Sequence, residues 1–210
     1  MITEQMLDGL RRAVSEGISP KRFYHTAEVE KMAVRLAELY APQKTAELRA
    51  AALLHDLTKE YPTELHIKIC AERDVELDAD ALYASKTLHA RTAAALIPEI
   101  FPEFATEEII RCVRWHTTGR EGMTIEEKII YLADYIDMSR NFEDCVKLRD
   151  FFFSAQPENM DESQRLAHLR RTLIMSFDMT VAGLLEDGYP ISVDTLRARN
   201  QLIREELSTR

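Results

Sequence analysis

The stretch AALLHDLTKE, residues 51–60, decides the fold of this chain. Its Ala and Leu residues predict the buried end of a helix. His55 lies one helical turn after Ala51, and Asp56 lies one turn after Ala52, so both polar side chains face the side that the apolar residues bury. A buried carboxylate without a compensating charge is very costly. The stretch therefore predicts a core helix that carries a polar site at its end.

On both sides of this stretch, apolar residues recur at helical spacing almost throughout the chain. Only six Gly and seven Pro occur in 210 residues, which disfavours a turn-rich β fold. We predict an all-α fold and a single domain over residues 1–210, with a metal-binding core at about 20–140 and C-terminal helices at about 141–210. The predicted helices cover approximately residues 3–16, 20–39, 44–57, 62–70, 88–97, 106–116, 124–136, 161–186 and a stretch after 192. Residues 72–84 are expected to form a loop with a short turn, and residues 140–153 a mixed segment.

Four histidines share one unusual property, because each lies on the apolar face of a different predicted helix. They are His25, His55, His89 and His116. A lone histidine on such a face is more often a hydrogen-bonded core residue than a ligand. Asp134, one turn after Ile130, adds a second carboxylate to the expected core. A neighbouring arginine could neutralise each carboxylate, but a metal site explains the carboxylates and the histidines together.

The donor types limit the metal. Imidazole and carboxylate ligands without thiolate suit Fe, Mn, Zn, Ni or Co. Six candidate ligands exceed what one open catalytic ion requires, and the two oxygens of Asp56 could bridge two ions. Two ions held about 3.5–4 Å apart suit hydrolytic displacement at phosphorus. The odd number of cysteines, three, argues against a disulfide framework. The first residues lack the basic-then-apolar order of a signal peptide, and no apolar run is long enough to span a membrane. Together these features predict a reducing, cytoplasmic location.

Basic and small residues near the expected ligands favour a phosphate substrate, although each alone also fits a solvated surface or a helix end. Lys59 follows His55 by one turn, and it is the candidate expected to act in catalysis together with Asp56. The other candidates for substrate binding are Arg22, Thr117, Thr118, Gly119 and Arg140. His66 fits no ligand pattern, and His168 is expected on a solvated face.

The charge of the chain bears on its partners. The formal net charge is -9, which disfavours nucleic acid and anionic membranes as partners. No apolar run approaches the length that spans a membrane. A small anionic substrate remains compatible, because bound metal ions and a few local bases make a positive pocket on a negative protein.

The order His, His-Asp, His, His, Asp resembles that of the HD-domain metal-dependent phosphohydrolases. The segments that carry it are HTAEVEKMAVRLA (25–37), AALLHDLTKE (51–60), LHARTAAAL (88–96), RWHTTGREGMTIEEKIIYLADYIDMSR (114–140) and TLRARN (195–200). WHTTG followed by EKIIYLADYI is similar to the bacterial YqeK group, the symmetrical bis(5'-nucleosyl)-tetraphosphatases or diadenosine tetraphosphate hydrolases. The resemblance covers roughly residues 20–200. Asp137 and Met138 stand where the family usually has Glu-Pro, and Ala90 where a glycine often follows the histidine.

This resemblance implies an all-α HD-domain helical bundle with two metal ions, iron being the expected metal. It implies that the first ion is held by His25, His55, Asp56 and Asp134. It implies that the second is held by His89 and His116, with Asp56 shared. The implied substrate is a small nucleotide, diadenosine tetraphosphate, cleaved to two ADP by a hydroxide held between the metals. Lys59, Thr118 and Arg140 would then lie in the phosphate-binding region.

Three alternatives stay open at this point. The chain could hydrolyse another nucleotide, or it could use a di-iron centre on the same scaffold as an oxygenase. A degenerate module that only binds nucleotide or protein is disfavoured because all six ligand positions are filled. The long helix expected at about 161–186 either packs its apolar face within the bundle or pairs two chains as a homodimer.

Overall fold

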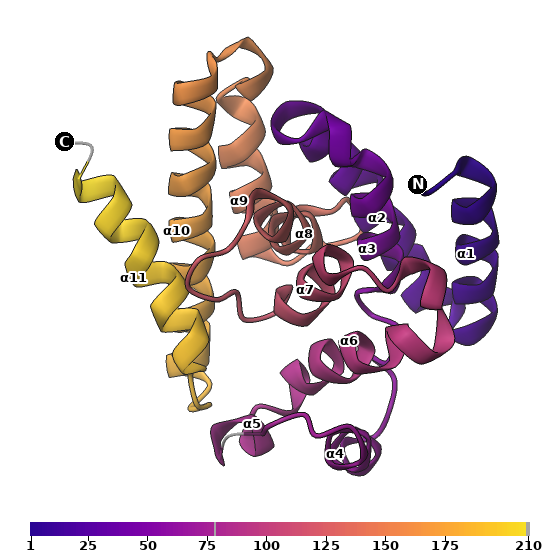
Figure 1. Ribbon diagram of the computed structural model, residues 1–210. Coiled ribbons are helices and arrows are strands. Elements are labelled where there is room, and N and C mark those ends of the chain that lie inside the picture. The colour runs from indigo at the N-terminus through magenta and orange to yellow at the C-terminus, as the bar shows by residue number, and fades with distance from the viewer. Residues whose placement is uncertain (78, 209–210) are drawn as a thin grey trace.

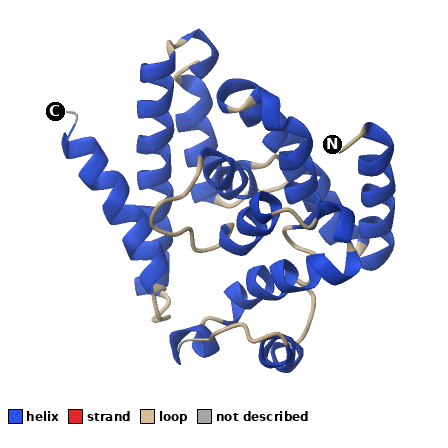
Figure 2. Ribbon diagram, viewed as in Figure 1, coloured by secondary structure: helices blue, strands red, loops and turns tan. Residues whose placement is uncertain are grey.

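The computed structural model describes residues 1–77 and 79–208 and contains only helices, turns and loops in those ranges (Figures 1 and 2). The α-helices are α1 (Glu4–Gly17), α2 (Pro20–Tyr40), α3 (Thr45–Leu54), α4 (Thr63–Glu72), α5 (Ala79–Tyr83), α6 (Leu88–Ile100), α7 (Glu107–Trp115), α8 (Ile125–Ile136), α9 (Glu143–Ser154), α10 (Glu162–Glu186) and α11 (Val193–Ser208). Short 3-10 helices occupy Pro42–Lys44, Ser85–Thr87, Pro102–Phe104 and Pro157–Asn159. The all-α prediction is confirmed.

Local sequence signals set where several helices begin. The side chain of Ser19 accepts a hydrogen bond from the Arg22 amide, and Pro20 occupies the first turn of α2, where its missing N–H costs nothing. Thr124 and Glu127 form a reciprocal capping box at the start of α8. These caps fix the starts of the two helices that later prove to carry His25 and Asp134.

One continuous hydrophobic core includes residues from Leu7 in α1 to Leu202 in α11. α2 packs on α3 and α8, and α7 packs on α3, α6 and α8. Figure 1 shows these helices in the middle of the molecule, with α1 on one flank and α10 and α11 on the other. Side chains that point inward from α2, α3, α6, α7 and α8 therefore meet at one place.

The long helix α10 divides its apolar face between the core and the surface. Leu169, Leu173 and Phe177 are buried within the chain, whereas Leu166 is exposed. α10 and α11 pack side by side (Figure 1), and α10 also packs on α9. Packing within the bundle thus accounts for the middle of the helix, and the homodimer stays a prediction.

Several helix bounds differ from the prediction. α6 continues to Ile100 and contains Pro98, which was expected to stop it. Pro98 lies in the last turn of the helix, so its missing N–H and its ring disturb only one hydrogen bond. α3 ends at Leu54, before His55, and the segment expected to be mixed forms α9.

Packing between α9 and α10 explains why the segment predicted as mixed is helical and why the prediction of an exposed His168 is wrong. Phe152 of α9 is fully buried against α10 and covers His168, which was expected on a solvated face and is only 6% exposed. The His168 ring stacks on that of Phe152, and its Nε2 lies 2.9 Å from the Phe152 carbonyl oxygen. The polar neighbours of His168 in sequence gave no sign of this cover, because α9 comes from elsewhere in the chain.

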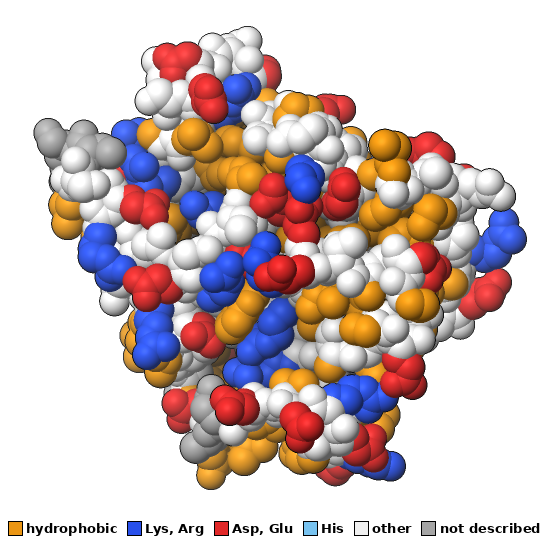
Figure 3. All heavy atoms as spheres, viewed as in Figure 1, with side chains coloured by type: hydrophobic (Ala, Val, Ile, Leu, Met, Phe, Trp, Pro, Cys, Tyr) orange, Lys and Arg blue, Asp and Glu red, His pale blue; other side chains and the backbone are white. Residues whose placement is uncertain are grey.

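The molecular surface carries both acidic and basic side chains. Acidic and basic side chains are interspersed over the face in Figure 3, with Lys and Arg gathered near its centre. A chain with a net charge of -9 thus still has locally basic surface. Among the described helices, none is long and apolar enough to cross a membrane.

Candidate metal centre

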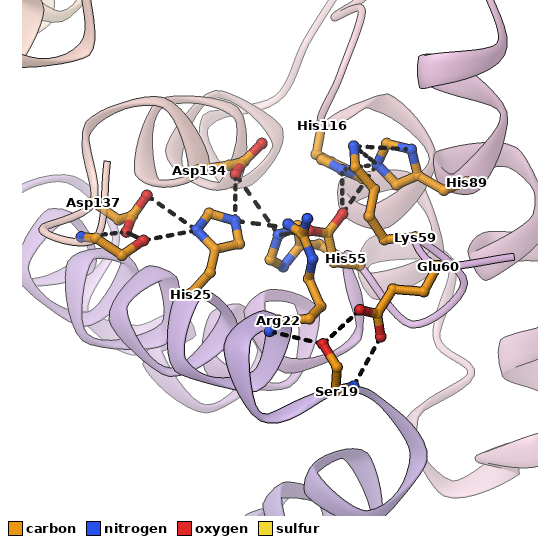
Figure 4. A network of polar contacts seen from close by, with 12 residues as sticks. Ser19, Arg22, His25, His55, Lys59, Glu60, His89, His116, Asp134 and Asp137 are labelled. Atoms are coloured by element: carbon orange, nitrogen blue, oxygen red, sulfur yellow. Dashed lines mark hydrogen bonds and ion pairs between the residues drawn. The ribbon is translucent and has the colours of Figure 1, made fainter. Parts of the chain in front are cut away.

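The turn that follows α3 positions the HD pair. The amide of Leu57 donates to the Leu54 carbonyl, and the amide of Lys59 donates to the Asp56 carbonyl, both across three residues. In such tight turns, side chains three residues apart lie above one another on the same side. Asp56 and Lys59 therefore lie on the same side of the turn, and Figure 4 shows Lys59 pointing toward His89 and His116.

The other predicted ligands come from four different helices. His25 lies on α2, His89 is the second residue of α6, and His116 follows the last residue of α7 directly. Asp134 lies near the end of α8. Figure 4 shows all of these side chains pointing toward one another. The structure thus brings together all six residues that the sequence suggested as ligands.

Asp56 lies between two groups of histidines. Its Oδ2 atom is 3.4 Å from Nε2 of His55 and 3.7 Å from Nε2 of His25. Its Oδ1 atom is 3.1 Å from Nε2 of His89 and 3.8 Å from Nε2 of His116. Each oxygen of this single carboxylate therefore faces a separate pair of imidazole nitrogens.

Asp134 joins the first of these pairs. Its Oδ1 atom is 3.0 Å from Nε2 of His25 and 3.7 Å from Nε2 of His55. Two sets of three side chains offer ligand atoms that all lie within 4.8 Å of one another, namely His25, His55, Asp134 and His55, Asp56, His116. This spacing fits a metal ion surrounded by nitrogen and oxygen donors.

Hydrogen bonds fix the tautomers of two rings. Nδ1 of His55 lies 2.6 Å from the Ala52 carbonyl oxygen, and Nδ1 of His116 lies 2.7 Å from the Val113 carbonyl oxygen. A carbonyl oxygen only accepts, so both Nδ1 atoms carry a proton and donate. When the rings are neutral, both Nε2 atoms present a lone pair to the centre, which is the form in which histidine binds a metal.

Two of these inward nitrogens make no hydrogen bond. They are Nε2 of His25 and Nε2 of His55, and both are buried. Nε2 of His89 lies 3.0 Å from Nε2 of His116 and 3.1 Å from Oδ1 of Asp56. Buried polar atoms are nearly always satisfied, and a metal ion between His25 and His55 would satisfy the two nitrogens that lack a hydrogen bond. The residues present therefore fit a metal centre.

The electrostatics keep the carboxylates charged. Burial alone would raise the pKa of Asp56, but the neighbouring His55, His116 and His89 outweigh it and hold that pKa well below its usual range. Burial likewise works against Asp134, where the positive charge of Arg140 outweighs it and lowers the pKa well below the usual range. Both carboxylates are therefore available as anionic ligands at neutral pH.

The histidines divide by their surroundings. Burial lowers the pKa of His89 to about 3 and also lowers that of His116, so both rings are neutral near pH 7. His25 is the opposite case. Burial lowers its pKa, but Asp134 and Asp137 beside it raise the pKa overall to about 9. Its proton must leave before Nε2 can bind a metal.

Three cations border the centre. Nη1 of Arg22 lies 2.7 Å from Oδ2 of Asp56, Arg140 donates to Oδ1 of Asp134, and Nζ of Lys59 lies 3.2 Å from Nε2 of His89. The two arginines thus supply part of the positive charge that would neutralise the carboxylates if the site held salt bridges and no metal. They neutralise the two carboxylates, but they leave Nε2 of His25 and Nε2 of His55 without a hydrogen bond, which favours the metal site.

The segment Thr117–Gly119 is built into the fold. The Thr118 hydroxyl donates to the Gly119 carbonyl, and the Thr118 carbonyl accepts from the hydroxyl of Thr195 on α11. Gly119 has a φ of +62°, and a Cβ there would lie 2.7 Å from Cζ of Phe177. These contacts account for Thr118 and Gly119 as parts of a turn, so their role in substrate binding stays a prediction. Thr117 has a buried hydroxyl oxygen without a partner.

Some residues of the site were missed in the sequence. Nδ1 of His66, which lies outside the ligand group, is 2.8 Å from the Thr92 hydroxyl. Thr92 in turn contacts the Thr58 hydroxyl, which donates to the His89 carbonyl. Asp137 and Ser139 lie against His25. The spacing of Asp134 and Asp137, three apart at the end of a helix, was the available signal, since it predicts side chains on one face.

Comparison with known proteins gives consistent results. Residues 22–139 match the HD domain family. A symmetrical bis(5'-nucleosyl)-tetraphosphatase of Halalkalibacterium halodurans is 34% identical over 194 residues, which are 92% of this chain and 95% of that protein. The Bacillus subtilis protein of the same name is 32% identical over 193 residues, 90% of this chain and 94% of that protein.

A solved structure agrees in fold. The crystal structure of a protein from Clostridium acetobutylicum, described as a predicted HD superfamily hydrolase involved in NAD metabolism, has a TM-score of 0.81 and 31% sequence identity. The match covers 98% of this chain and 100% of that one. With the six inward side chains, these likenesses show that the chain belongs to the HD-domain hydrolases, in the branch of the symmetrical bis(5'-nucleosyl)-tetraphosphatases.

Proposed function

We propose that this chain is a metal-dependent hydrolase that cleaves diadenosine tetraphosphate symmetrically to two ADP. The observation that carries the proposal is the Asp56 carboxylate, whose two oxygens face two separate pairs of histidine nitrogens. The relatives named symmetrical bis(5'-nucleosyl)-tetraphosphatases support the substrate class.

The proposed ligands form two sets that share Asp56. His25, His55 and Asp134 belong with its Oδ2, and His89 and His116 belong with its Oδ1. Nitrogen and carboxylate donors suit iron, manganese, cobalt, nickel and zinc, and among them we propose iron. Two bound ions would supply activated water at neutral pH and would neutralise charge on phosphate oxygens.

The cations at the border of the centre would bind the polyphosphate. Arg22 and Arg140 each contact a carboxylate oxygen, and a guanidinium has five N–H donors, so donors remain for phosphate. The pKa of Lys59 is lowered, and the largest cause is its burial. A buried ammonium next to the centre would stabilise the negative charge that develops on the phosphoryl oxygens.

The reaction requires one bond to form and one to break. An oxygen from water bonds to one of the two central phosphorus atoms, and the bridging P–O bond to the other central phosphate breaks. The departing group is ADP, a stable anion, so strong protonation of the leaving oxygen is not required. Arg22, Lys59 and Arg140 would hold the tetraphosphate chain so that a central phosphorus faces the proposed centre.

The test is product analysis. Protein reconstituted anaerobically with iron should convert diadenosine tetraphosphate to ADP as the sole nucleotide product, and the same chain stripped of metal should not. AMP plus ATP would contradict the symmetrical cleavage. Absence of turnover with metal bound would contradict the substrate, and substrate-dependent oxygen uptake would then favour the oxygenase alternative.

A further inference from the structure

Asp137 is a buried carboxylate that the proposed reaction does not use. Its side chain is 0% exposed, and its Oδ2 atom makes no hydrogen bond. It lies directly after α8 in the loop that carries Ser139 and Arg140. Burying a carboxylate costs free energy unless it is paired, so its neighbours indicate what it does there.

The neighbours of Asp137 include one candidate metal ligand. The Asp137 Oδ1 atom accepts hydrogen bonds from the amide of Ser139, at 2.8 Å, and from the Ser139 hydroxyl. The Ser139 oxygen lies 3.0 Å from Nδ1 of His25, and Oδ2 of Asp137 lies 3.4 Å from the same nitrogen. Figure 4 shows Asp137 on the side of the His25 ring that faces away from the centre.

The donor and the acceptor can be assigned in each hydrogen bond among Asp137, Ser139 and His25. A carboxylate oxygen accepts, so the Ser139 hydroxyl must donate its only proton to Asp137. The Ser139 oxygen can then only accept from Nδ1 of His25. That nitrogen therefore keeps its proton, and Nε2 is the nitrogen left to bind a metal. Nε2 points toward Asp134 and Asp56, at 3.0 and 3.7 Å.

The loop is held in place from a second helix. Arg149 of α9 donates to the carbonyls of Asp137 and Arg140. Nε of Arg140 also lies 3.4 Å from Oδ2 of Asp137. These contacts fix both ends of the loop. The Asp137 carboxylate is therefore held against His25 by the loop and does not depend on its contact with the ring.

We propose that Asp137, acting through the Ser139 hydroxyl, is a positioning residue that holds the proton on Nδ1 of His25 and so presents Nε2 to the metal. The proposal rests on the proposed metal centre. Partners that orient a metal-binding histidine in this way typically change metal affinity by about 10- to 100-fold when they are replaced. With the neutral amide of Asn in place of the carboxylate, the acceptor for the Ser139 hydroxyl is weaker. The hydroxyl can then donate to Nδ1 instead, which favours the tautomer with Nε2 protonated.

The experiment measures metal binding directly. Mn²⁺ is titrated into the metal-free full-length chain, and free Mn²⁺ is followed by electron paramagnetic resonance. In Asp137→Asn, one of the two sites should bind about 10- to 100-fold more weakly, and the site of His89 and His116 should be unchanged. Asp137→Glu retains the carboxylate and should recover most of the loss. Asp144→Asn, at an exposed carboxylate of α9, is the matched control and should bind as the wild type does.

The outcomes separate this proposal from the one on which it rests. Wild-type affinity in Asp137→Asn, or equal losses in Asp137→Asn and Asp137→Glu, would overturn the role of Asp137 alone. If circular dichroism shows that Asp137→Asn does not fold, Ser139→Ala decides, since it removes only the relaying hydroxyl. It should weaken the same site about tenfold, and unchanged binding would overturn the proposal. A wild-type chain that binds no Mn²⁺ would overturn the metal centre, and this inference with it.

Discussion

At the scale of single residues, the site depends on which nitrogen of each histidine carries a proton. Backbone carbonyls hold the Nδ1 protons of His55 and His116, so their Nε2 atoms face the centre as lone pairs. His25 differs, because carboxylates lie on both sides of its ring. Metal binding would therefore have to displace a proton from His25, and this proton has a measurable effect on the chain without metal.

We expect His25 to make the stability of the metal-free chain depend on pH. Burial lowers its pKa, but Asp134 and Asp137 raise it overall to about 9, above the ordinary value of 6.5. A pKa that folding raises stabilises the folded state below the unfolded pKa, and this stabilisation is lost as pH rises through the folded pKa. The contribution is on the order of 3 kcal/mol and should disappear between about pH 6.5 and 9.

Urea unfolding of the metal-free wild type and of His25→Gln at both ends of this range tests the prediction. The free-energy difference between the two proteins should shrink at the higher pH. Other titrating groups cancel in that difference, because both chains have them. A difference that stays the same at both pH values would contradict the raised pKa.

Lys59 should act on the reaction and not on metal binding. We expect Lys59→Gln to lower kcat for diadenosine tetraphosphate by about 100- to 1000-fold, because a preorganised charge next to the developing phosphoryl charge is lost. Lys68→Gln, whose side chain is 68% exposed on α4, is the control and should retain wild-type kcat. Metal content and kcat are measured on the same samples. An unchanged kcat in Lys59→Gln would rule out this role.

At the scale of elements, the ends of helices carry the site. His55 and Asp56 follow α3, His116 follows α7, and His89 begins α6. The last carbonyl groups of a helix have no partner within the helix. The Ala52 and Val113 carbonyls accept hydrogen bonds from His55 and His116 and so orient two of the proposed ligands. The turn after His116 is further held by α10 and α11, through Phe177 and Thr195.

Gly119 should be irreplaceable in that turn. Its φ of +62° strains other residues, and a Cβ would lie 2.7 Å from Cζ of Phe177. We expect Gly119→Ala to destabilise the chain by about 1–3 kcal/mol and to weaken metal binding at His116. Thermal unfolding and Mn²⁺ titration measure the two effects.

Gly183 of α10 provides the matched control, because a Cβ there meets no atom within 4 Å. Gly183→Ala should stabilise the chain by about 0.5–1 kcal/mol, since Ala restricts the unfolded chain more than Gly does. Equal effects of the two substitutions would show that the turn tolerates a side chain and that Phe177 does not constrain it.

The helices and the inward-facing histidines could be predicted from the sequence, because local patterns indicate them. The Thr124 capping box and the apolar faces behind His25 and His89 are local patterns, and they identified helices and inward histidines. The resemblance to HD-domain proteins predicted how the six ligands divide. Phe152 covers His168, and Arg22 pairs with Asp56. In each case the two residues belong to different elements, so no local sequence pattern predicts the contact. The same holds for Asp137, which was noted only as a departure from the family.

At the scale of the whole molecule, the centre joins most of the bundle. Its proposed ligands come from α2, α6, α7, α8 and the turn after α3. The buried Nε2 atoms of His25 and His55 make no hydrogen bond, so bound metal should hold these elements together.

Metal should therefore stabilise the folded chain as a unit. A ligand that binds only the folded state stabilises it by about 2.7 kcal/mol at a free concentration 100 times its Kd. We expect Tm to rise with added Mn²⁺ and to return to the metal-free value after chelation. His25→Gln should show a smaller rise. A Tm that is independent of Mn²⁺ would contradict metal binding to the folded chain.

We propose that Asp56 joins two metal ions in one centre. Metal analysis combined with electron paramagnetic resonance of the Mn²⁺-loaded chain measures both the number of ions and their separation. We expect two ions per chain with spin coupling between them, and loss of that coupling in Asp56→Asn. One ion per chain, or two ions without coupling in the wild type, would contradict it.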